Sequence, residues 1–298
     1  MLNRRKFLKN SGALALGGLA LSHVSWATSP AAVRPIGIQL YTFFREIDQD
    51  LNGTLKKIAG LGYQELESAF SMKGGYYGLK PKEFNQLAKD LGLAWRAHHV
   101  LGTPFIPPPD MKLPEAFSKM RSLKEHHQEL VDEVAEGGIK YLVCANIDIK
   151  SADAVKAAVD ILNKTGEACK KAGVTLCYHN HDAEFKSVDG LVPYDVFLSQ
   201  LSSDIKMELD LAWVSKAGVD PVELFKKHPG RFPLWHVKDF DKEFKTLMPV
   251  GSGVIDFKRI FDHAKVAGLV HPFVEHDMPP NAVESISASI TYLNKLLK

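Results

Sequence analysis

The chain has 298 residues and a mass of 33.0 kDa, a length that suits one α/β barrel as well as two small domains. Hydrophobic residues make up 45% and charged residues 24%, which excludes a disordered chain, a collagen-like chain and a multi-span membrane protein. The net charge of +2 and the pI of about 8.3 are slightly basic, so the distribution of the charge decides whether an anionic partner is indicated.

Residues 1–27 have the pattern of an export signal. A basic head that includes Arg4 and Arg5 precedes an apolar stretch at 13–21 and a small-x-small cleavage site that ends at Ala27. The apolar stretch is shorter than the roughly 20 residues of a membrane-spanning helix. The string RRKFLK resembles the twin-arginine signal, which implies export of the folded protein to the periplasm and would allow a metal to be loaded before export. The alternative is the basic start of an ordinary helix.

The export signal accounts for the basic balance of the chain. It carries four positive side chains and no acidic one, so residues 28–298 have a net charge of −2. We therefore expect no nucleic-acid partner and, after cleavage, no membrane anchor. Three cysteines without CxxC spacing predict buried thiols rather than disulfides.

From residue 35 onward, short β-rich runs alternate with stretches of helical periodicity. In chain order, the predicted elements are strand 36–42, helix 51–61, strand 63–69, helix 81–91, strand 93–100, helix 115–136, strand 141–147, helix 152–172, strand 174–181, strand 205–213, helix 221–228, strand 232–240, helix 256–267, strand 271–277 and helix 281–297.

This alternation predicts a parallel sheet with crossover helices, and eight strands favour a closed (β/α)8 TIM barrel that forms a single domain over 28–298. Asn52, Ser151 and Asp220 stand where helix N-caps are expected. The proline-rich segment 103–114 predicts an extended loop over the barrel mouth.

Polar side chains gather at the ends of the last four predicted strands, where a TIM barrel has its catalytic groups. Residues two apart in a strand share a face. The pairs that this rule selects are His179 with His181, Glu208 with Asp210, His236 with Lys238, and Glu275 with Asp277. Singly, each is more often a cap or a core hydrogen-bonder. Together they favour a site, because burying so many unpaired ionisable groups costs several kcal/mol.

One residue from each strand would bring two imidazoles and two carboxylates to one point. Such a set suits a single divalent ion, Mn²⁺, Zn²⁺, Co²⁺ or Mg²⁺. The strings HNHDAEF, ELDLAW, WHVKDF, PVGSGVIDF and FVEHD, with GIQLYTF at the first strand, resemble the xylose isomerase-like TIM barrels, which include sugar phosphate isomerase/epimerase-like proteins. The resemblance covers about residues 35–297. The family also includes dehydratases and lyases of 3-keto-glycosides.

The resemblance implies that Asp210, His236 and Glu275 are metal ligands. His179 takes the strand-five position, where many relatives have a glutamate, and this change favours softer metals. It also removes one glutamate of a two-glutamate epimerase mechanism. His181, two residues further on, is similar to the acid/base of relatives that eliminate across a keto-sugar.

The implied chemistry is proton abstraction next to a carbonyl. His181, with a near-neutral pKa, is the predicted base, and Lys238 and Glu275 complete the catalytic set. The alternative for Lys238 is a salt bridge with Asp239 at the barrel rim. Of the neighbours His98 and His99, only one can face inward. The predicted substrate-binding residues are Gln39, Tyr41, Glu67, His99, Asn146, Glu184 and Trp213.

Three functions remain open at this point. The first is a metal-dependent isomerase or epimerase of an unphosphorylated sugar, since no glycine-rich anion loop is present. The second is a lyase or hydratase of keto-sugars or 3-keto-glycosides. The third is a carbohydrate-binding barrel without catalysis, or an endonuclease-like relative. For each of the carbohydrate-related functions, the expected partner is a small-molecule carbohydrate. The sequence is also compatible with a homo-oligomer.

Overall fold

The computed structural model describes residues 34–106, 115–118 and 120–298. The predicted export signal and its cleavage site at 1–27 lie outside the described residues, as does most of the predicted mouth loop, at 107–114. Among the described residues, no helix is long and apolar enough to span a membrane. The three cysteines are free and buried, as predicted.

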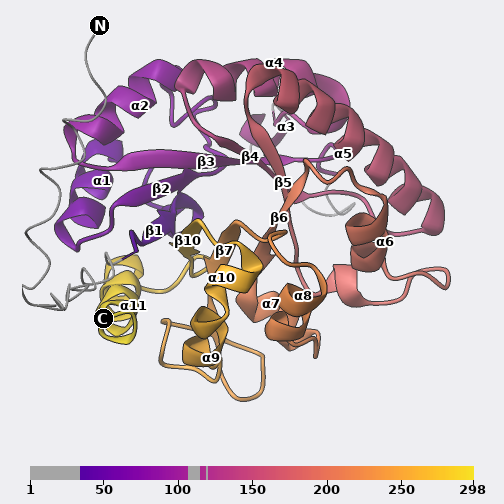
Figure 1. Cartoon of the computed structure of the whole chain (residues 1–298). Helices are drawn as coiled ribbons and strands as arrows, with labels where there is room; N and C mark the ends of the chain where they lie inside the picture. Colours follow the sequence, from indigo (N-terminus) through magenta and orange to yellow (C-terminus); the bar gives the residue numbers. More distant parts are fainter. Residues whose placement is uncertain (1–33, 107–114, 119) are drawn as a thin grey trace, which may run out of the picture. The chain divides into compact units, whose positions relative to one another are not determined.

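Eight parallel strands form a closed barrel, which confirms the predicted (β/α)8 fold (Figure 1). Each strand pairs with the next one along the chain, and the last pairs with the first. The strands are β1 (Gly37–Gln39), β2 (Glu65–Ser68), β3 (Ala94–Leu101), β4 (Tyr141–Asn146), β5 (Thr175–His179), β6 (Lys206–Asp210), β7 (Leu234–Val237) and β10 (His271–Val274).

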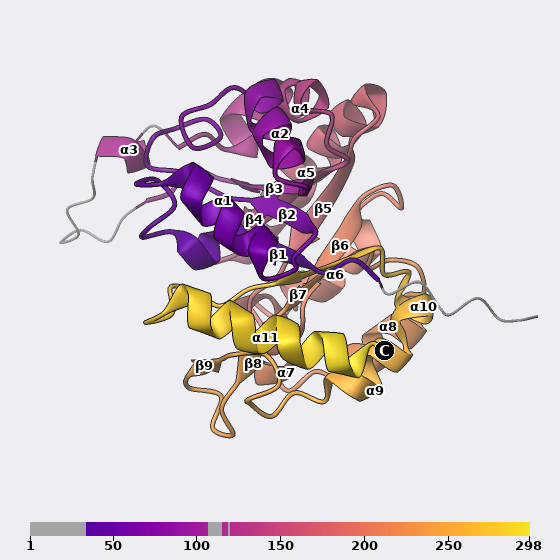
Figure 2. The same ribbon diagram turned by 90° about the vertical axis from the view of Figure 1, so that its left-hand side faces the viewer.

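Helices surround the barrel and cover the outer faces of its strands (Figure 1). Figure 2 shows α1 and α11, near the two ends of the described chain, on the side where β1 and β10 close the barrel. The helices are α1 (Leu51–Gly60), α2 (Pro81–Asp90), α3 (Glu115–Ser118), α4 (Leu123–Gly137), α5 (Ala152–Ala172), α6 (Pro193–Gln200), α7 (Leu211–Lys216), α8 (Pro221–Lys227), α9 (Phe257–Asp262), α10 (Ala264–Ala267) and α11 (Ala282–Leu296).

The element boundaries differ from the prediction where a side chain bonds to the backbone. Ser151 and Asp220 cap their helices as predicted, but α1 is capped by Asp50, whose Oδ1 accepts the Gly53 N–H at 2.8 Å, and not by Asn52. The predicted helices 115–136 and 256–267 are each broken into two. Helix α6 follows β5, where a crossover helix was expected but no range was predicted.

The predicted strand 205–213 ends early because Asp210 caps a helix. Its Oδ1 accepts the backbone N–H groups of Ala212 and Trp213, which starts α7 directly at the end of β6. The predicted strand 232–240 also divides. Its last residues form β8 (Asp239–Phe240), which pairs antiparallel with β9 (Leu247–Met248) outside the barrel.

The lower barrel interior, toward the N-terminal ends of the strands, contains a layer of apolar side chains. This layer consists of Ala97, Tyr141, Val143, Cys177, Leu234 and Phe273. Gly37 on β1 makes room for the Phe273 ring, because a Cβ at Gly37 would lie 2.4 Å from Phe273 Cδ1. A second, larger core joins the outer face of the strands to the helices. The packed lower layer leaves the upper interior for polar groups.

Replacing Gly37 with alanine is expected to destabilise the barrel by about 1–3 kcal/mol, because the buried Phe273 ring must move. Urea denaturation monitored by circular dichroism measures the change. The matched control is Gly60→Ala at the end of α1, where a Cβ meets no atom within 4 Å. That control is expected to keep or slightly raise stability, by up to about 1 kcal/mol. Equal stability of the two variants would contradict the prediction.

Candidate metal centre and active site

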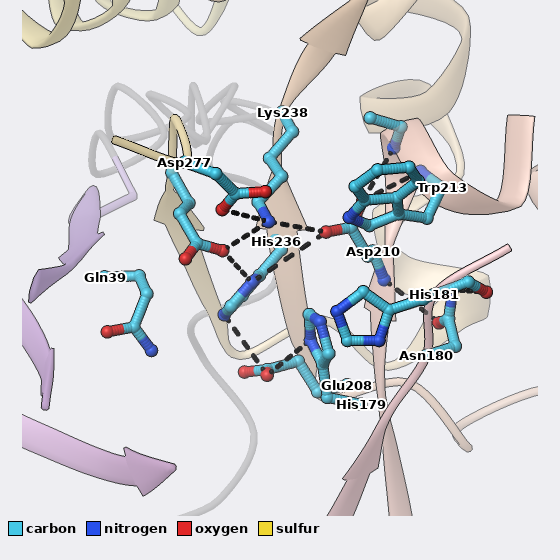
Figure 3. Close-up of polar contacts among 12 residues, drawn as sticks. Gln39, His179, Asn180, His181, Glu208, Asp210, Trp213, His236, Lys238 and Asp277 are labelled. Atoms are coloured by element: carbon cyan, nitrogen blue, oxygen red, sulfur yellow. Dashed lines mark hydrogen bonds and ion pairs between the residues drawn. The ribbon is translucent and has the colours of Figure 1, made fainter. Parts of the chain in front are cut away.

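Buried ionisable side chains lie above the apolar layer, toward the C-terminal ends of the strands. Figure 3 shows the polar contacts among several of them. Two groups of residues are defined by their contacts and by their order along the strands. The inner group consists of Gln39, Glu67, His99, His179, Glu208 and His236. The mouth group consists of Asp210, His236, Lys238, Glu275 and Asp277. His236 belongs to both, since each of its ring nitrogens faces a different group.

The mouth group brings three carboxyl groups, an imidazole and an ammonium together. His236 Nδ1 lies 2.7 Å from Glu275 Oε2 and 4.0 Å from Asp210 Oδ2. Lys238 Nζ lies 2.7 Å from Glu275 Oε2, 3.4 Å from Asp210 Oδ2 and 2.8 Å from Asp277 Oδ1. Three of the four predicted metal ligands, Asp210, His236 and Glu275, therefore converge on one point.

Burial controls the charges of the mouth group. Desolvation raises the pKa of Asp210 to about 7 and that of Glu275 to about 7, although Lys238 opposes the shift in both cases. Burial disfavours the charged form of Lys238, but Asp277, Glu275 and Asp210 outweigh it and raise the pKa of the lysine well above its usual value. Lys238 therefore stays positively charged, and it is shared among three carboxyl groups, those of Asp210, Glu275 and Asp277.

The inner group is organised around Glu208. Its Oε2 lies 2.7 Å from His99 Nε2, 3.1 Å from His179 Nδ1 and 3.2 Å from His236 Nε2. Burial favours the neutral acid, but His236 and His99 outweigh it and lower the pKa of Glu208. The fourth predicted ligand, His179, thus lies in the inner group, and its ring centroid is 4.5 Å from that of His236.

Several buried polar atoms at this end of the barrel have no hydrogen-bond partner among the described residues. They are Glu67 Oε1, Glu208 Oε1, Asp210 Oδ2 and His236 Nδ1. The contact between His236 Nδ1 and Glu275 is short enough for an ion pair but makes no hydrogen bond. Unpartnered carboxylate oxygens beside an imidazole nitrogen are the donor set of a divalent cation, so the residues present fit one.

His181 lies beside the mouth group, with its ring centroid 5.0 Å from His179 and 5.8 Å from Trp213. Burial and the nearby Lys238 lower the pKa of His181 to about 4. The predicted near-neutral pKa is therefore wrong, because desolvation and a neighbouring positive charge disfavour the imidazolium. The ring is neutral at physiological pH, so its lone pair is available to accept a proton.

The remaining predicted substrate residues fall in different places. Gln39 and Glu67 are fully buried in the inner group and bonded to each other, Nε2 to Oε2, at 2.9 Å. Tyr41 is half-buried near the mouth group, where burial and then Asp277 and Glu275 raise the pKa of its phenol. Asn146 is exposed at the end of β4. Their contact with a substrate stays a prediction.

Glu184 holds the backbone at His181 through hydrogen bonds. Its Oε2 accepts the His181 N–H at 2.9 Å and its Oε1 accepts the Tyr178 hydroxyl at 2.8 Å. The structure also separates the two adjacent histidines of β3. His99 faces the barrel interior, whereas His98 Nδ1 lies 2.8 Å from Ser68 Oγ.

Trp213 stands in the first turn of α7, next to the mouth. Its half-buried ring packs against Phe240, with centroids 5.2 Å apart, and Lys216 Nζ lies 4.5 Å from its centroid. Its Nε1 is buried without a hydrogen-bond partner among the described residues. An aromatic face with an unused donor is suited to a sugar ring.

The alternative of a Lys238–Asp239 salt bridge is wrong, because alternation sends the two side chains to opposite faces. Lys238 bonds to Asp277, whereas Asp239 accepts the backbone N–H groups of Phe240, Gly251, Gly253 and Ile255. A Cβ at Gly253 would lie 2.4 Å from Asp239 Oδ1, so the loop needs glycine there. Asp239 is thus the anchor of the loop after β8.

The sequence interpretation assigned no role to Glu208 or Asp277. Both follow from the same two-residue alternation that selected Asp210 and Glu275. That rule does not say how deep in the barrel a residue lies. Depth depends on where each strand ends, and β6 ends at Asp210 because of the cap on α7.

A closed eight-stranded barrel with carboxylates and histidines at the C-terminal ends of its strands defines a TIM barrel with a candidate metal centre. Residues 55–296 match the model of the xylose isomerase-like TIM barrels, and the chain belongs to that family. No curated protein matches the sequence.

Solved structures agree with this assignment. A sugar phosphate isomerase/epimerase from Parabacteroides distasonis ATCC 8503 is 28% identical with a TM-score of 0.72, over 94% of this chain and 99% of that one. An L-ribulose 3-epimerase is 17% identical with a TM-score of 0.66, over 89% and 94%. An IolI protein with a bound zinc atom is 15% identical with a TM-score of 0.65, over 88% and 98%. The latter two show likeness of fold alone.

His98 is expected to make the protein less stable in acid. Burial, followed by His99 and Arg121, lowers its folded pKa to about 3, below the usual value near 6.5. The unfolded chain therefore binds an extra proton between these pH values, and this residue's contribution falls by about 2 kcal/mol from pH 7 to pH 5. Urea denaturation at both pH values should show a smaller loss for His98→Gln. Parallel pH profiles of variant and wild type would contradict this.

Proposed function

We propose that the protein is a divalent-metal-dependent enzyme that isomerises or epimerises an unphosphorylated sugar or keto-sugar. The observation that carries the proposal is the convergence of Asp210, His236 and Glu275 beside a neutral His181 and a charged Lys238. Ligands, base and cation are the parts that proton removal next to a carbonyl requires. The names of the similar structures support a carbohydrate substrate.

Asp210, His236 and Glu275 would hold the ion, and His179 is the proposed fourth ligand. Mn²⁺, Zn²⁺, Co²⁺ and Mg²⁺ are the candidate ions, and the two imidazoles favour Zn²⁺ or Co²⁺. The zinc atom of the IolI protein supports this choice. A divalent ion supplies Lewis acidity, which polarises the carbonyl and hydroxyl oxygens of a bound sugar.

His181 removes the proton from the carbon next to the carbonyl in this proposal. Its ring is uncharged, and Glu184 fixes its backbone through the bond to the His181 N–H. Lys238 donates a hydrogen bond to the oxygen that gains negative charge, since Asp277 and Glu275 already hold its ammonium at the mouth. Trp213 would stack on the sugar ring. Return of the proton to the other face, or to the adjacent carbon, gives the product.

The second candidate is a lyase or hydratase of 3-keto-glycosides. The same base removes the same proton, but a substituent on the next carbon then leaves with its electron pair. His179 favours this candidate, because it stands where a two-glutamate epimerase would have one of its acids. The third candidate is a carbohydrate-binding barrel, which needs neither a base nor a cation. For residues 1–27 we retain the proposal of a twin-arginine export signal and a periplasmic location.

Deuterium exchange separates these functions. Wild-type protein with Mn²⁺ or Zn²⁺ in D₂O should exchange the α-proton of D-fructose or of a 3-keto-glucoside, as measured by proton NMR, and EDTA should abolish the exchange. His181→Asn should slow it by at least about 100-fold, since a general base contributes roughly 10²–10⁴. The control is Glu223→Gln, which removes only an exposed ion pair with Lys226.

Exchange with recovered ketose supports the isomerase or epimerase, whereas release of the aglycone or of water identifies the lyase. Absence of exchange, with no effect of EDTA, contradicts both enzymes and leaves the binding protein.

Removal of a proposed ligand is expected to empty the metal centre. His179→Ala and Asp210→Asn should each lower zinc affinity by more than the roughly 10–100-fold that loss of an outer-shell partner costs. Elemental analysis after dialysis measures the bound metal, and circular dichroism verifies folding. His263→Ala, in the helical layer between α9 and α10, is the control. Full occupancy in His179→Ala would contradict the placement of that ligand.

A further inference from the structure

A row of aromatic side chains at the barrel mouth belongs neither to the proposed metal centre nor to the two apolar cores of the described chain. This aromatic row consists of Tyr41, Phe44, Phe70, Phe117 and Phe105. We propose that the aromatic row binds the aromatic aglycone of a glycoside whose sugar ring lies at the mouth group. The proposal rests on the proposed function for the position of the sugar.

The five rings form a continuous series of contacts. The centroids of Tyr41 and Phe44 are 5.2 Å apart, and those of Phe44 and Phe70 are 6.3 Å apart. Phe117 lies 5.2 Å from Phe70 and 6.1 Å from Phe105. The rings come from the segments that follow β1, β2 and β3. Because these segments leave the C-terminal ends of the strands, the aromatic row and the mouth group share one end of the barrel.

The aromatic row begins beside the mouth group. Tyr41 lies close enough to Asp277, Glu275 and Lys238 for their charges to act on its hydroxyl. The strand before Tyr41, β1, pairs with β10, whereas Trp213 follows β6, on the far side of β10 and β7. The mouth group comes from the ends of β6, β7 and β10. A sugar held there therefore lies between Trp213 and the first ring of the aromatic row.

The rings of the aromatic row have surface that a ligand can cover. The four inner rings are half-buried, and Phe105 at the outer end is 44% exposed. Phe261 differs from them, because it is half-buried but packs against the larger core. Partly exposed apolar rings that adjoin a polar site, and that a core does not require, are typical of a ligand-binding surface.

Asp48 fixes two of the rings relative to each other. It lies four residues after Phe44, and its carboxylate accepts the Ser71 hydroxyl at 2.6 Å and the Met72 N–H at 2.7 Å. Phe70 directly precedes Ser71, so Asp48 joins the two loops that carry Phe44 and Phe70. A surface that is already held in its binding shape loses less entropy when a ligand binds.

The extent and the chemistry of the aromatic row favour an aromatic aglycone over a free sugar. The mouth group and Trp213 already supply the polar and stacking contacts of one sugar ring. The aromatic row adds four phenylalanines, which have no hydrogen-bonding group, and one phenol. A planar apolar group attached to the sugar would stack on these rings and leave water. Aryl 3-keto-glycosides, substrates of the second candidate function, belong to this class.

Calorimetric titration of the full chain with phenyl and methyl β-D-glucoside, in the presence of zinc, tests the inference. Neither glucoside has a carbonyl group, so the proposed reaction consumes neither. The phenyl glucoside should bind at least about 10-fold more tightly, because its ring stacks and is buried. Phe44→Ala and Phe70→Ala should each lower the affinity for phenyl glucoside about 3–10-fold and leave that for methyl glucoside unchanged.

The matched control is Phe261→Ala in α9. Phe261 is also half-buried, but its ring contacts Trp235, with centroids 5.3 Å apart, in the helical layer. It should leave both affinities unchanged. The preference of the wild type for phenyl over methyl glucoside decides the question if the alanine variants do not fold.

Equal affinity of the wild type for the two glucosides would overturn the inference and leave the proposed function standing. A preference for phenyl glucoside that is unchanged in both Phe44→Ala and Phe70→Ala would overturn it as well. Absence of binding by either glucoside would overturn the carbohydrate site together with this inference. The expected preference, without proton exchange on a keto-sugar, would support the inference and contradict the proposed reaction alone.

Discussion

The polar interior of this barrel is organised around one imidazole, that of His236, which lies between carboxyl groups of the inner group and of the mouth group. His236 contacts Glu67 and Glu208 through Nε2 and Glu275 through Nδ1, and its side chain is fully buried. A buried neutral ring cannot donate to both sides, and burial lowers the pKa of His236 well below its usual value. On the Nδ1 side, the Lys238 ammonium lies 2.7 Å from the same Glu275 Oε2 and supplies one positive charge. The candidate ligands Asp210 and Glu275, the charged Lys238 and the neutral His181 lie at the mouth of the barrel near this ring.

The polar contacts of His236 lie above the apolar layer of the lower barrel, which influences their strength. Phe273 and its neighbours form a buried apolar layer in the lower barrel, and Gly37 makes room for the Phe273 ring. Low polarity beneath the inner group strengthens each hydrogen bond there and makes each unpartnered oxygen costly. The packing of the lower barrel therefore affects the strength of the polar contacts in the upper barrel.

Most of the fold and part of the site follow from sequence patterns. Alternating strands and helices predict the barrel because each pattern is local. The pairs two residues apart include Asp210, His236 and Glu275, and the family resemblance singles these three out as ligands. The depth of each side chain along the barrel axis was not predictable from these patterns. His179 lies lower than expected, with Glu208 and His99, and Gln39 and Glu67 are buried beneath the mouth. The pKa of His181 likewise depends on burial, which periodicity does not measure.

The anchor at Asp239 separates two parts of the chain that are adjacent in sequence. Four backbone N–H groups from both ends of the loop after β8 bond to its carboxylate, directly beside Lys238. The β8–β9 hairpin therefore leaves and rejoins the barrel wall at a fixed clamp. Substitutions or insertions within 241–248 can change what this hairpin presents at the surface without displacing the lysine. The hairpin can therefore differ in length or sequence while Asp239 keeps the backbone next to Lys238 in place.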